Sequence, residues 1–194
     1  SAVKSLKKIY SNWIPTEKII VLNIWSAELA KLVSNAFFAQ RISSINSISE
    51  LCENTGADVL EIANSVGKDH RIGEHFLNPS PGFGGSCFKK DILCLVYIAK
   101  QLGLDNVAKY WNQVIEINDH QRFRIANMII NSFNENYNNK KVGILGWAFK
   151  KGTNDSRESS SIYITERLLK TDLKISVYDP LVNEKKNFQR LMFI

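Results

Sequence analysis

The stretch VGILGWAFKKGTNDSRESSSIYITERLLKTDLKISVYDP, residues 142–180, decides the class of fold. Its apolar runs over 142–149 and 173–180 have the length and composition of β-strands, and residues 157–170 between them have helical periodicity. A strand, a helix and a strand in this order predict a βαβ unit, because a crossover helix lets the two strands run parallel. This part of the chain is therefore predicted to be α/β.

A polar run, NENYNNK over residues 134–140, indicates a domain boundary before the βαβ unit. Beyond it, Asp155 and Glu158 have the D-x-x-E spacing of a capping box, which supports the start of the crossover helix predicted over 157–170. Most of the chain before the boundary has helical periodicity. The predicted fold is a mostly helical domain followed by the start of a parallel α/β domain, and the predicted parts are residues 1–23, 24–137 and 138–194.

In the helical part, apolar residues recur at three- and four-residue intervals. Ser26 is a suitable N-cap for a long helix, and Gly56 is suitable for the left-handed residue that ends it. The apolar run ILCLVYIA predicts a helix that is buried on nearly all sides, and the last helix is expected to be a spine or an oligomer seam. Residues 1–23 are predicted to form a helix, a turn and a short strand over 19–22. The other predicted helices are 26–54, 57–66, 88–101 and 106–135.

The composition excludes several classes of protein. The chain has 194 residues, 44% of them apolar and 23% charged, as in ordinary globular proteins. No apolar run is long enough to cross a bilayer, so no membrane insertion is expected. The 25 lysines and arginines exceed the 19 acidic residues and give a net charge of +6, which favours anionic ligands. Since this charge is spread along the chain, no nucleic-acid partner is expected.

The three cysteines, Cys52, Cys87 and Cys94, lack the spacing of a disulfide framework or a zinc site. We therefore expect a reducing compartment, the cytosol, and no metal. Cys52 and Cys94 lie among apolar helical residues and are expected to be buried. The chain starts at Ser1 rather than at a methionine, and we expect it to be a piece of a longer polypeptide.

The segment GFGGSCFKKD, residues 82–91, has the strongest signs of chemistry. Ser86 is a suitable N-cap, which would place Cys87 in the first helical turn, where free N–H groups and the helix dipole stabilise a thiolate. Asp91 lies on the same helix face four residues later, where it can accept a proton. The alternative is that Cys87 is a small buried apolar residue and that the glycines only shape a turn. The residues alone give both interpretations about equal weight.

Two further sets of polar residues carry weaker signals. Lys31 and Asn35 lie one turn apart on a helix and can point into a cleft together, although such residues are more often solvated. Lys150 and Arg157 lie between a strand and a helix, at the edge where α/β sheets bind ligands. That position favours a phosphate group, and a solvated loop is an equally good account. The glycines of the preceding strand lack the spacing of the dinucleotide motif G-x-G-x-x-G.

Three segments of the chain together resemble the nucleotide-sugar dehydrogenase family. They are AELAKLVSNAFFAQRISSINSISELCENTGAD over 27–58, NPSPGFGGSCFKKD over 78–91 and GILGWAFKKGTNDSRESSS over 143–161. The resemblance runs in collinear order to about residue 180. It implies that residues 1–23 end an N-terminal dinucleotide-binding domain. It also implies that 24–137 form the central dimerisation and catalytic domain, and that 138–194 start a Rossmann-like UDP-binding domain.

The resemblance implies oxidation of UDP-glucose to UDP-glucuronate in two steps that consume NAD, in a homo-oligomer. Cys87 corresponds to the nucleophile that forms a thiohemiacetal and then a thioester. Lys31 corresponds to the lysine that stabilises the oxyanion, Asn35 to its partner and Asp91 to the carboxylate that activates water. The implied cofactor-side residues are Cys87, Lys90 and Arg157. The implied substrate-side residues are Lys31, Asn35, Arg71, Phe76, Leu77, Asn78, Ser80, Phe83, Gly84, Phe149 and Lys150.

Two alternatives stay open at the level of sequence. The chain can belong to a nucleotide-sugar dehydrogenase with another substrate, such as GDP-mannose. It can also be a truncated module that oligomerises without catalysis. The family's glycine fingerprint is not in these residues, so we expect the isolated chain to be inactive. Asn78 departs from the family, whose animal members have a basic residue there.

Overall fold

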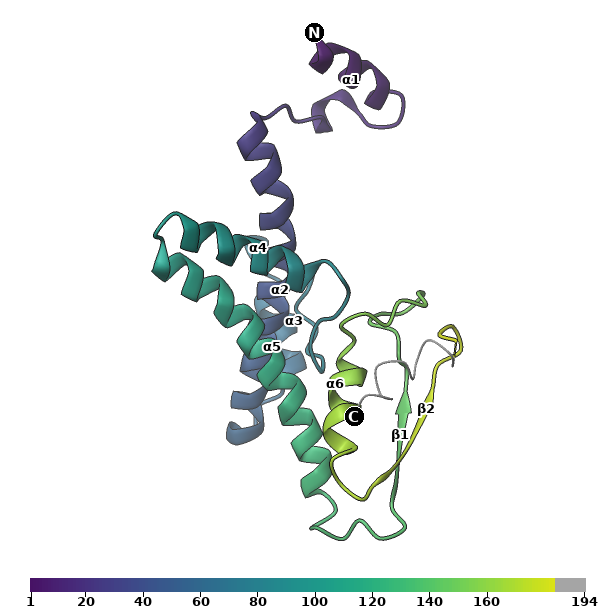
Figure 1. The fold of residues 1–194 in the computed structure, drawn as a ribbon. Helices are drawn as coiled ribbons and strands as arrows, with labels where there is room; N and C mark the ends of the chain where they lie inside the picture. The colour runs from purple at the N-terminus through teal and green to yellow at the C-terminus, as the bar shows by residue number, and fades with distance from the viewer. Residues whose placement is uncertain (184–194) are drawn as a thin grey trace.

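A computed structural model describes residues 1–183 and contains mainly helices with one small sheet (Figure 1). This architecture confirms the predicted fold class. Residues 184–194, with which the predicted third part ends, lie outside the described residues. The elements are α1 (Ala2–Tyr10), the 3-10 helix η1 (Thr16–Lys18), α2 (Ile24–Thr55), α3 (Val59–Gly67), α4 (Phe88–Gln101), α5 (Asp105–Asn131), β1 (Lys141–Leu145), α6 (Ser160–Leu168) and β2 (Lys174–Tyr178).

The core of the helical part lies where α2, α4 and α5 pack against one another. Ala36 and Ala39 of α2 are fully buried there, and their small side chains let the neighbouring helices approach closely. Helix α5 continues past this core and packs against α6, with Ala126 fully buried between them. Helix α5 is therefore a spine that joins the helical part to the α/β unit (Figure 1).

Strands β1 and β2 are parallel, with Lys141 opposite Lys174 and Leu145 opposite Tyr178. The carboxylate of Asp179, directly after β2, accepts backbone hydrogen bonds from the loop that follows β1, at 2.7 Å from Trp147 N and 3.0 Å from Ala148 N. Backbone hydrogen bonds from Ala148, Trp147 and Leu181 lower the pKa of Asp179 to about 2. Asp179 thus fixes the start of the loop that carries Phe149 and Lys150.

Three local predictions are wrong. Helix α2 begins at Ile24, since the side chain of Asn23 rather than Ser26 is the cap and accepts a hydrogen bond from Ser26 N at 2.9 Å. Residues 19–22 form no strand, because β1 and β2 pair only with each other among the described residues. Helix α5 ends at Asn131 rather than at residue 135.

The start of α6 also differs from the predicted capping box. The helix begins at Ser160, because the carboxylate of Asp155 is engaged by the backbone N–H and the guanidinium of Arg157. Glu158 has a φ of +56°, a left-handed conformation that no helix contains. The segment over residues 155–159 is therefore an irregular turn, which leaves its carbonyl groups available to other parts of the chain.

One face of α4 is open to solvent, contrary to the prediction that this helix is buried on nearly all sides. Tyr97 is 63% exposed, and Leu93 and Cys94 are also exposed. The opposite face, with Ile92 and Leu95, faces the helical core. Helix α1 stands apart from that core and has no buried residue (Figure 1). None of the helices in residues 1–183 combines the length and apolar character needed to cross a membrane.

Candidate functional site

Cys87 lies at the N-terminal end of α4 with its thiol exposed. Its carbonyl oxygen accepts the hydrogen bond from Asp91 N at 2.8 Å, so Cys87 itself is the N-cap. The prediction that Ser86 is the cap is therefore wrong by one residue. Gly85, with a φ of +85°, makes the turn directly before the helix. This geometry places the sulfur at the open positive end of the helix dipole.

Lys31 and Asn35 of α2 meet Asp91 of α4, which lies one helical turn after Cys87. Lys31 Nζ donates to the two carboxylate oxygens of Asp91 at 2.8 Å and 2.6 Å, and Asn35 Nδ2 donates at 2.5 Å. Asp91 is 3% exposed. The structure thus brings together three of the predicted catalytic residues, which come from two helices that are far apart in the sequence.

The charges in this triad are fixed by their contacts. Burial favours a raised pKa at Asp91, but hydrogen bonds from Lys31 and Asn35 outweigh it and hold the pKa below its ordinary value. The hydrogen bond to Asp91 raises the pKa of Lys31. At neutral pH the carboxylate is therefore ionised and the lysine protonated. Lys31 can donate a hydrogen bond to a developing negative charge, and Asp91 can accept a proton.

A cavity of about 600 Å³ opens in front of Cys87. Its walls come from both parts of the molecule, since Cys87 lies on one side and Phe149 and Lys150 of the α/β unit lie on the other. A volume of this size is typical of small-molecule sites. Of the predicted substrate-side residues, the cavity is lined by Phe76, Ser80, Phe83, Gly84, Phe149 and Lys150.

The helical part and the α/β unit touch at Gly84 and Gly85. A Cβ atom on Gly84 would lie 2.5 Å from the carbonyl oxygen of Glu158, and one on Gly85 would lie 2.9 Å from the ring of Phe149. Neither distance is tolerable for a carbon atom, so only glycine fits these positions. The glycines therefore allow the loop to lie against the α/β unit.

Several predicted residues lie outside the cavity lining, among them Lys31, Asn35 and Asp91. The guanidinium of Arg71 forms a bidentate pair with Asp69 and its side chain is 78% exposed. Leu77 is buried in a small apolar cluster of the helical part. Asn78 lines a neighbouring hollow of about 250 Å³. Lys90 is exposed, and Arg157 is paired with Asp155.

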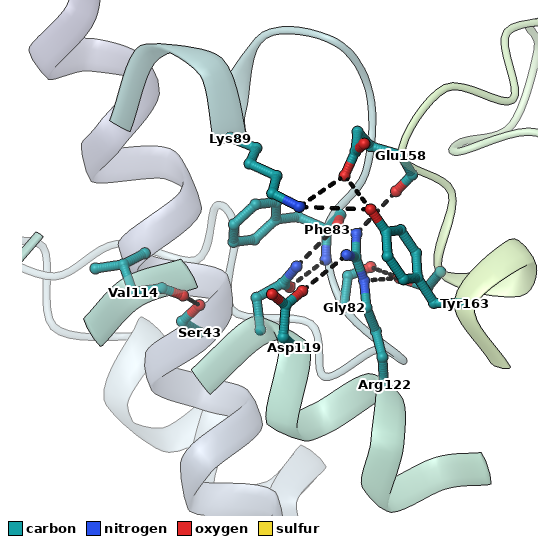
Figure 2. Close-up of polar contacts among 11 residues, drawn as sticks. Ser43, Gly82, Phe83, Lys89, Val114, Asp119, Arg122, Glu158 and Tyr163 are labelled. Carbon is teal, nitrogen blue, oxygen red and sulfur yellow. Dashed lines mark hydrogen bonds and ion pairs between the residues drawn. The ribbon is translucent and has the colours of Figure 1, made fainter. Parts of the chain in front are cut away.

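Sequence reasoning missed two polar residues of α5 that hydrogen-bond to the backbone of Phe83, in the loop before Cys87; one of them, Arg122, is labelled in Figure 2. Asn118 of α5 is 1% exposed, accepts a hydrogen bond from Phe83 N at 2.7 Å and donates one to Phe83 O at 3.2 Å. Arg122, one turn later, is also 1% exposed. A signal for both was available, because Asn118 and Arg122 interrupt the apolar stripe of α5 at helical spacing.

Arg41 supports the other wall of the cavity and was not predicted. Its guanidinium donates to the carbonyl oxygens of Ile72, Gly73 and His75 at 2.8 Å, 2.6 Å and 2.8 Å. These carbonyls directly precede Phe76, whose φ is +62°. Arg41 thereby fixes the strained turn that brings the Phe76 ring to the cavity.

Comparisons with known families and proteins give consistent matches. Residues 25–120 match a profile described as the UDP-glucose/GDP-mannose dehydrogenase family, central domain, and residues 143–192 match that family's UDP binding domain. UDP-glucose 6-dehydrogenase 3 of Arabidopsis thaliana is 55% identical over 96% of the chain, and the Gallus gallus UDP-glucose 6-dehydrogenase is 56% identical over 95%. The chain spans 39% and 37% of the lengths of these two relatives.

A solved structure gives the same family likeness. The UDP-glucose dehydrogenase of the hyperthermophilic archaeon Pyrobaculum islandicum superposes with a TM-score of 0.87 and 32% identity. The superposition covers 98% of this chain and 43% of the archaeal chain.

Proposed function

The chain belongs to the UDP-glucose/GDP-mannose dehydrogenase family, and we propose on that premise that it carries the UDP-sugar site and the cysteine nucleophile of such an enzyme. The whole enzyme oxidises UDP-glucose to UDP-glucuronate in two NAD-dependent steps. The observation that carries this proposal is the cavity shared by the two parts, with Cys87 on one wall and Lys150 on the other. In such a cavity the sugar of the substrate can lie at the Cys87 thiol while its negatively charged diphosphate lies at the Lys150 ammonium.

The residues of the site support covalent chemistry at Cys87. The sulfur adds to the carbonyl carbon of a sugar aldehyde, so that an S–C bond forms, the C=O π bond breaks and the oxygen becomes a hydroxyl by taking up a proton. Lys31 stabilises the negative charge that develops on this oxygen. After oxidation to a thioester, water attacks the carbonyl carbon, Asp91 accepts a proton from that water, and the Cys87 thiolate leaves.

The cofactor has only a partial site in this chain. Lys90 and Arg157 are exposed cations, and the backbone of Arg157 contacts the loop before Cys87, where its carbonyl oxygen accepts a hydrogen bond from Gly85 N at 2.8 Å. Both suit the pyrophosphate of a dinucleotide. NAD, when bound, supplies the two-electron acceptor of each oxidation. Since the 194 residues contain no dinucleotide fingerprint, the isolated chain is expected to form no NADH from NAD and UDP-glucose.

Two further properties belong to the proposal. The exposed apolar residues Leu93, Tyr97, Val107 and Tyr110 on α4 and α5 support assembly through the central helices into a homo-oligomer. Three free cysteines, two of them exposed, support a reducing compartment, the cytosol.

Ligand binding to the 194-residue chain tests the proposed substrate. UDP-glucose is expected to slow the alkylation of Cys87 by iodoacetamide and to leave the alkylation of the exposed Cys94 unchanged, as followed by peptide mass spectrometry. Lys150→Met is expected to weaken UDP-glucose binding about tenfold, because a partly desolvated charge contact to phosphate is lost. Lys151→Met is the matched control, since Lys151 is outside the cavity lining.

Two outcomes contradict the proposed substrate. Equal protection of Cys87 and Cys94 means that the ligand does not bind in the cavity. Stronger protection by GDP-mannose than by UDP-glucose assigns the chain to the GDP-sugar members of the family instead.

A further inference from the structure

Two irregular segments from distant parts of the chain form the junction between the thiol and the α/β unit. We call residues 82–87 the cysteine loop and residues 155–160 the hinge segment. Two direct hydrogen bonds join them: Gly85 N donates to Arg157 O at 2.8 Å, and Ser160 Oγ donates to Gly82 O at 2.9 Å. Apart from Ser160, the first residue of α6, neither segment lies in a helix or a strand, so the support of side-chain contacts is needed to fix the junction.

Arg122 of α5 supplies that support (Figure 2). A single guanidinium nitrogen, Nη2, donates to Phe83 O of the cysteine loop at 2.5 Å and to Glu158 O of the hinge segment at 2.8 Å. Nε donates to Ser160 Oγ at 3.2 Å. The same side chain therefore holds both segments, and Ser160 in turn holds Gly82 O.

The remaining surface of the guanidinium is also occupied. Nη1 donates to Asp119 at 3.0 Å, and the guanidinium carbon lies 4.1 Å from the ring centroid of Tyr163. The Tyr163 hydroxyl donates to the Glu158 carboxylate at 2.6 Å, which also accepts from Lys89 Nζ at 3.2 Å. Because Lys89 lies two residues after Cys87, this cluster connects Arg122 to the first turn of α4 as well.

Only an arginine satisfies this set of contacts. The guanidinium has five donors in a fixed planar arrangement, whereas a lysine ammonium is a compact charge on a flexible stem that cannot reach two segments and an aromatic face together. There is also no room for adjustment, since a Cβ atom on Gly82 would lie 2.9 Å from Asn118 Oδ1 and 3.3 Å from Arg122 Cγ. The packing around Arg122 therefore defines the position of the loop.

We propose that Arg122 is a positioning residue that fixes the cysteine loop to the hinge segment, so that a ligand held by Phe149 and Lys150 is presented to Cys87. Arg122 is absent from the cavity lining and acts through the backbone of Phe83 and Glu158. The part of this inference that concerns ligand presentation rests on the proposed function. The part that concerns the loop does not.

The test compares Arg122→Lys with Arg124→Lys in the full 194-residue chain. Arg124 lies on the same helix and is largely buried, but it contacts Ser49, Glu53 and Gln121 rather than the cysteine loop. Hydrogen exchange is measured for every peptide. Arg122→Lys is expected to accelerate exchange of the Phe83 and Gly85 amides about tenfold or more, with the interior of α2 unchanged, because the bridge between the two segments is lost. Arg124→Lys is expected to leave the exchange rates of both amides at their wild-type values.

A second readout separates positioning from general stability. At saturating UDP-glucose, Arg122→Lys is expected to lose most of the protection of Cys87 against iodoacetamide, whereas Arg124→Lys retains it. If the wild-type chain binds no UDP-glucose, the proposed function fails, and hydrogen exchange still decides whether Arg122 holds the loop. Uniform acceleration across the chain, or exchange at Phe83 and Gly85 that stays at the wild-type rate, overturns the inference.

If Arg122→Lys does not fold, Ser160→Ala is the variant used for the hydrogen-exchange test. It keeps the charge of Arg122 and removes one acceptor of the guanidinium together with the donor to Gly82 O. Faster exchange confined to the cysteine loop and the hinge segment is expected, and wild-type exchange in both overturns the inference.

Discussion

At the scale of single residues, the site depends on a buried carboxylate whose partners come from another helix. Asp91 is almost completely buried, whereas the side chain of Lys31 is 62% exposed. The carboxylate must be compensated because it has left water, and Lys31 and Asn35 provide that compensation. The ion pair therefore both orders the site and ties α2 to α4.

Asp91→Asn is expected to lower the free energy of unfolding by about 1–3 kcal/mol at neutral pH, because charge-assisted hydrogen bonds are lost at a buried position. Urea unfolding measures this. Glu74→Gln is the control, since the Lys68–Glu74 pair has side chains 69% and 64% exposed and its loss is expected to change stability much less than the loss of the Asp91 contacts. Equal effects of the two substitutions contradict the account of Asp91.

The sequence indicated part of this triad and missed other supports. The helical spacing of Lys31 and Asn35 placed them on one face, and the spacing of Cys87 and Asp91 did the same on α4. No local pattern states which residues of two distant helices meet, so the ion pair itself was not predictable. Arg122 was missed because its partners are mainly backbone carbonyls, which every residue has.

At the scale of elements, helices were predictable and their ends were less so. Apolar periodicity located α2 to α5 within a few residues because burial of one face determines a helix. Helix starts depend on which side chain reaches a free N–H, and several candidates compete within one turn. The start of α2 differs from the predicted cap for this reason, whereas α4 and α6 have Cys87 and Ser159 at the N-cap position without a side-chain cap hydrogen bond. The predicted strand over residues 19–22 does not form because a strand needs a neighbouring strand to pair with.

The contact of the cysteine loop with the α/β unit is tested at Gly84. Gly84→Ala is expected to lower the free energy of unfolding by about 1–3 kcal/mol, because its Cβ meets the backbone of Glu158, which cannot move aside easily. Gly143→Ala is the matched control, since a Cβ at Gly143 meets nothing within 4 Å. Thermal or urea unfolding of the two variants gives the comparison, and a neutral Gly84→Ala would show that the loop does not pack as described.

The hydrogen bonds that Asp179 accepts from the loop after β1 predict that the stability of the chain depends on pH. The pKa of Asp179 falls from 3.8 to about 2 in the folded chain. The stability that the ionised Asp179 carboxylate contributes is therefore fully present above about pH 4 and is lost as the pH falls toward 2. Asp179→Asn is expected to destabilise the α/β unit at neutral pH and to weaken the dependence of stability on pH below 4. A variant with the wild-type acid profile refutes this role.

At the scale of the whole molecule, the cavity exists only because two differently folded parts meet. The spine helix α5 packs against α2 and α4 on the helical side and against α6 on the other, and Arg122 lies between these two contacts. The Cys87 thiol on the helical part and the Lys150 ammonium on the α/β part thereby face one cavity. The sequence predicted both parts and both sets of residues, but their common cavity follows only from the packing of α5.

The capture of an aldehyde by Cys87 tests the central claim most directly, because it requires the thiol and the cavity and no cofactor. The 6-aldehyde of UDP-glucose, labelled with ¹³C at C6, is added to the 194-residue chain and followed by NMR. We expect a protein-bound thiohemiacetal carbon signal in the wild type and in Cys94→Ala, and no such signal in Cys87→Ala. An adduct that persists in Cys87→Ala, or no adduct in the wild type, would contradict the assignment of Cys87 as the nucleophile.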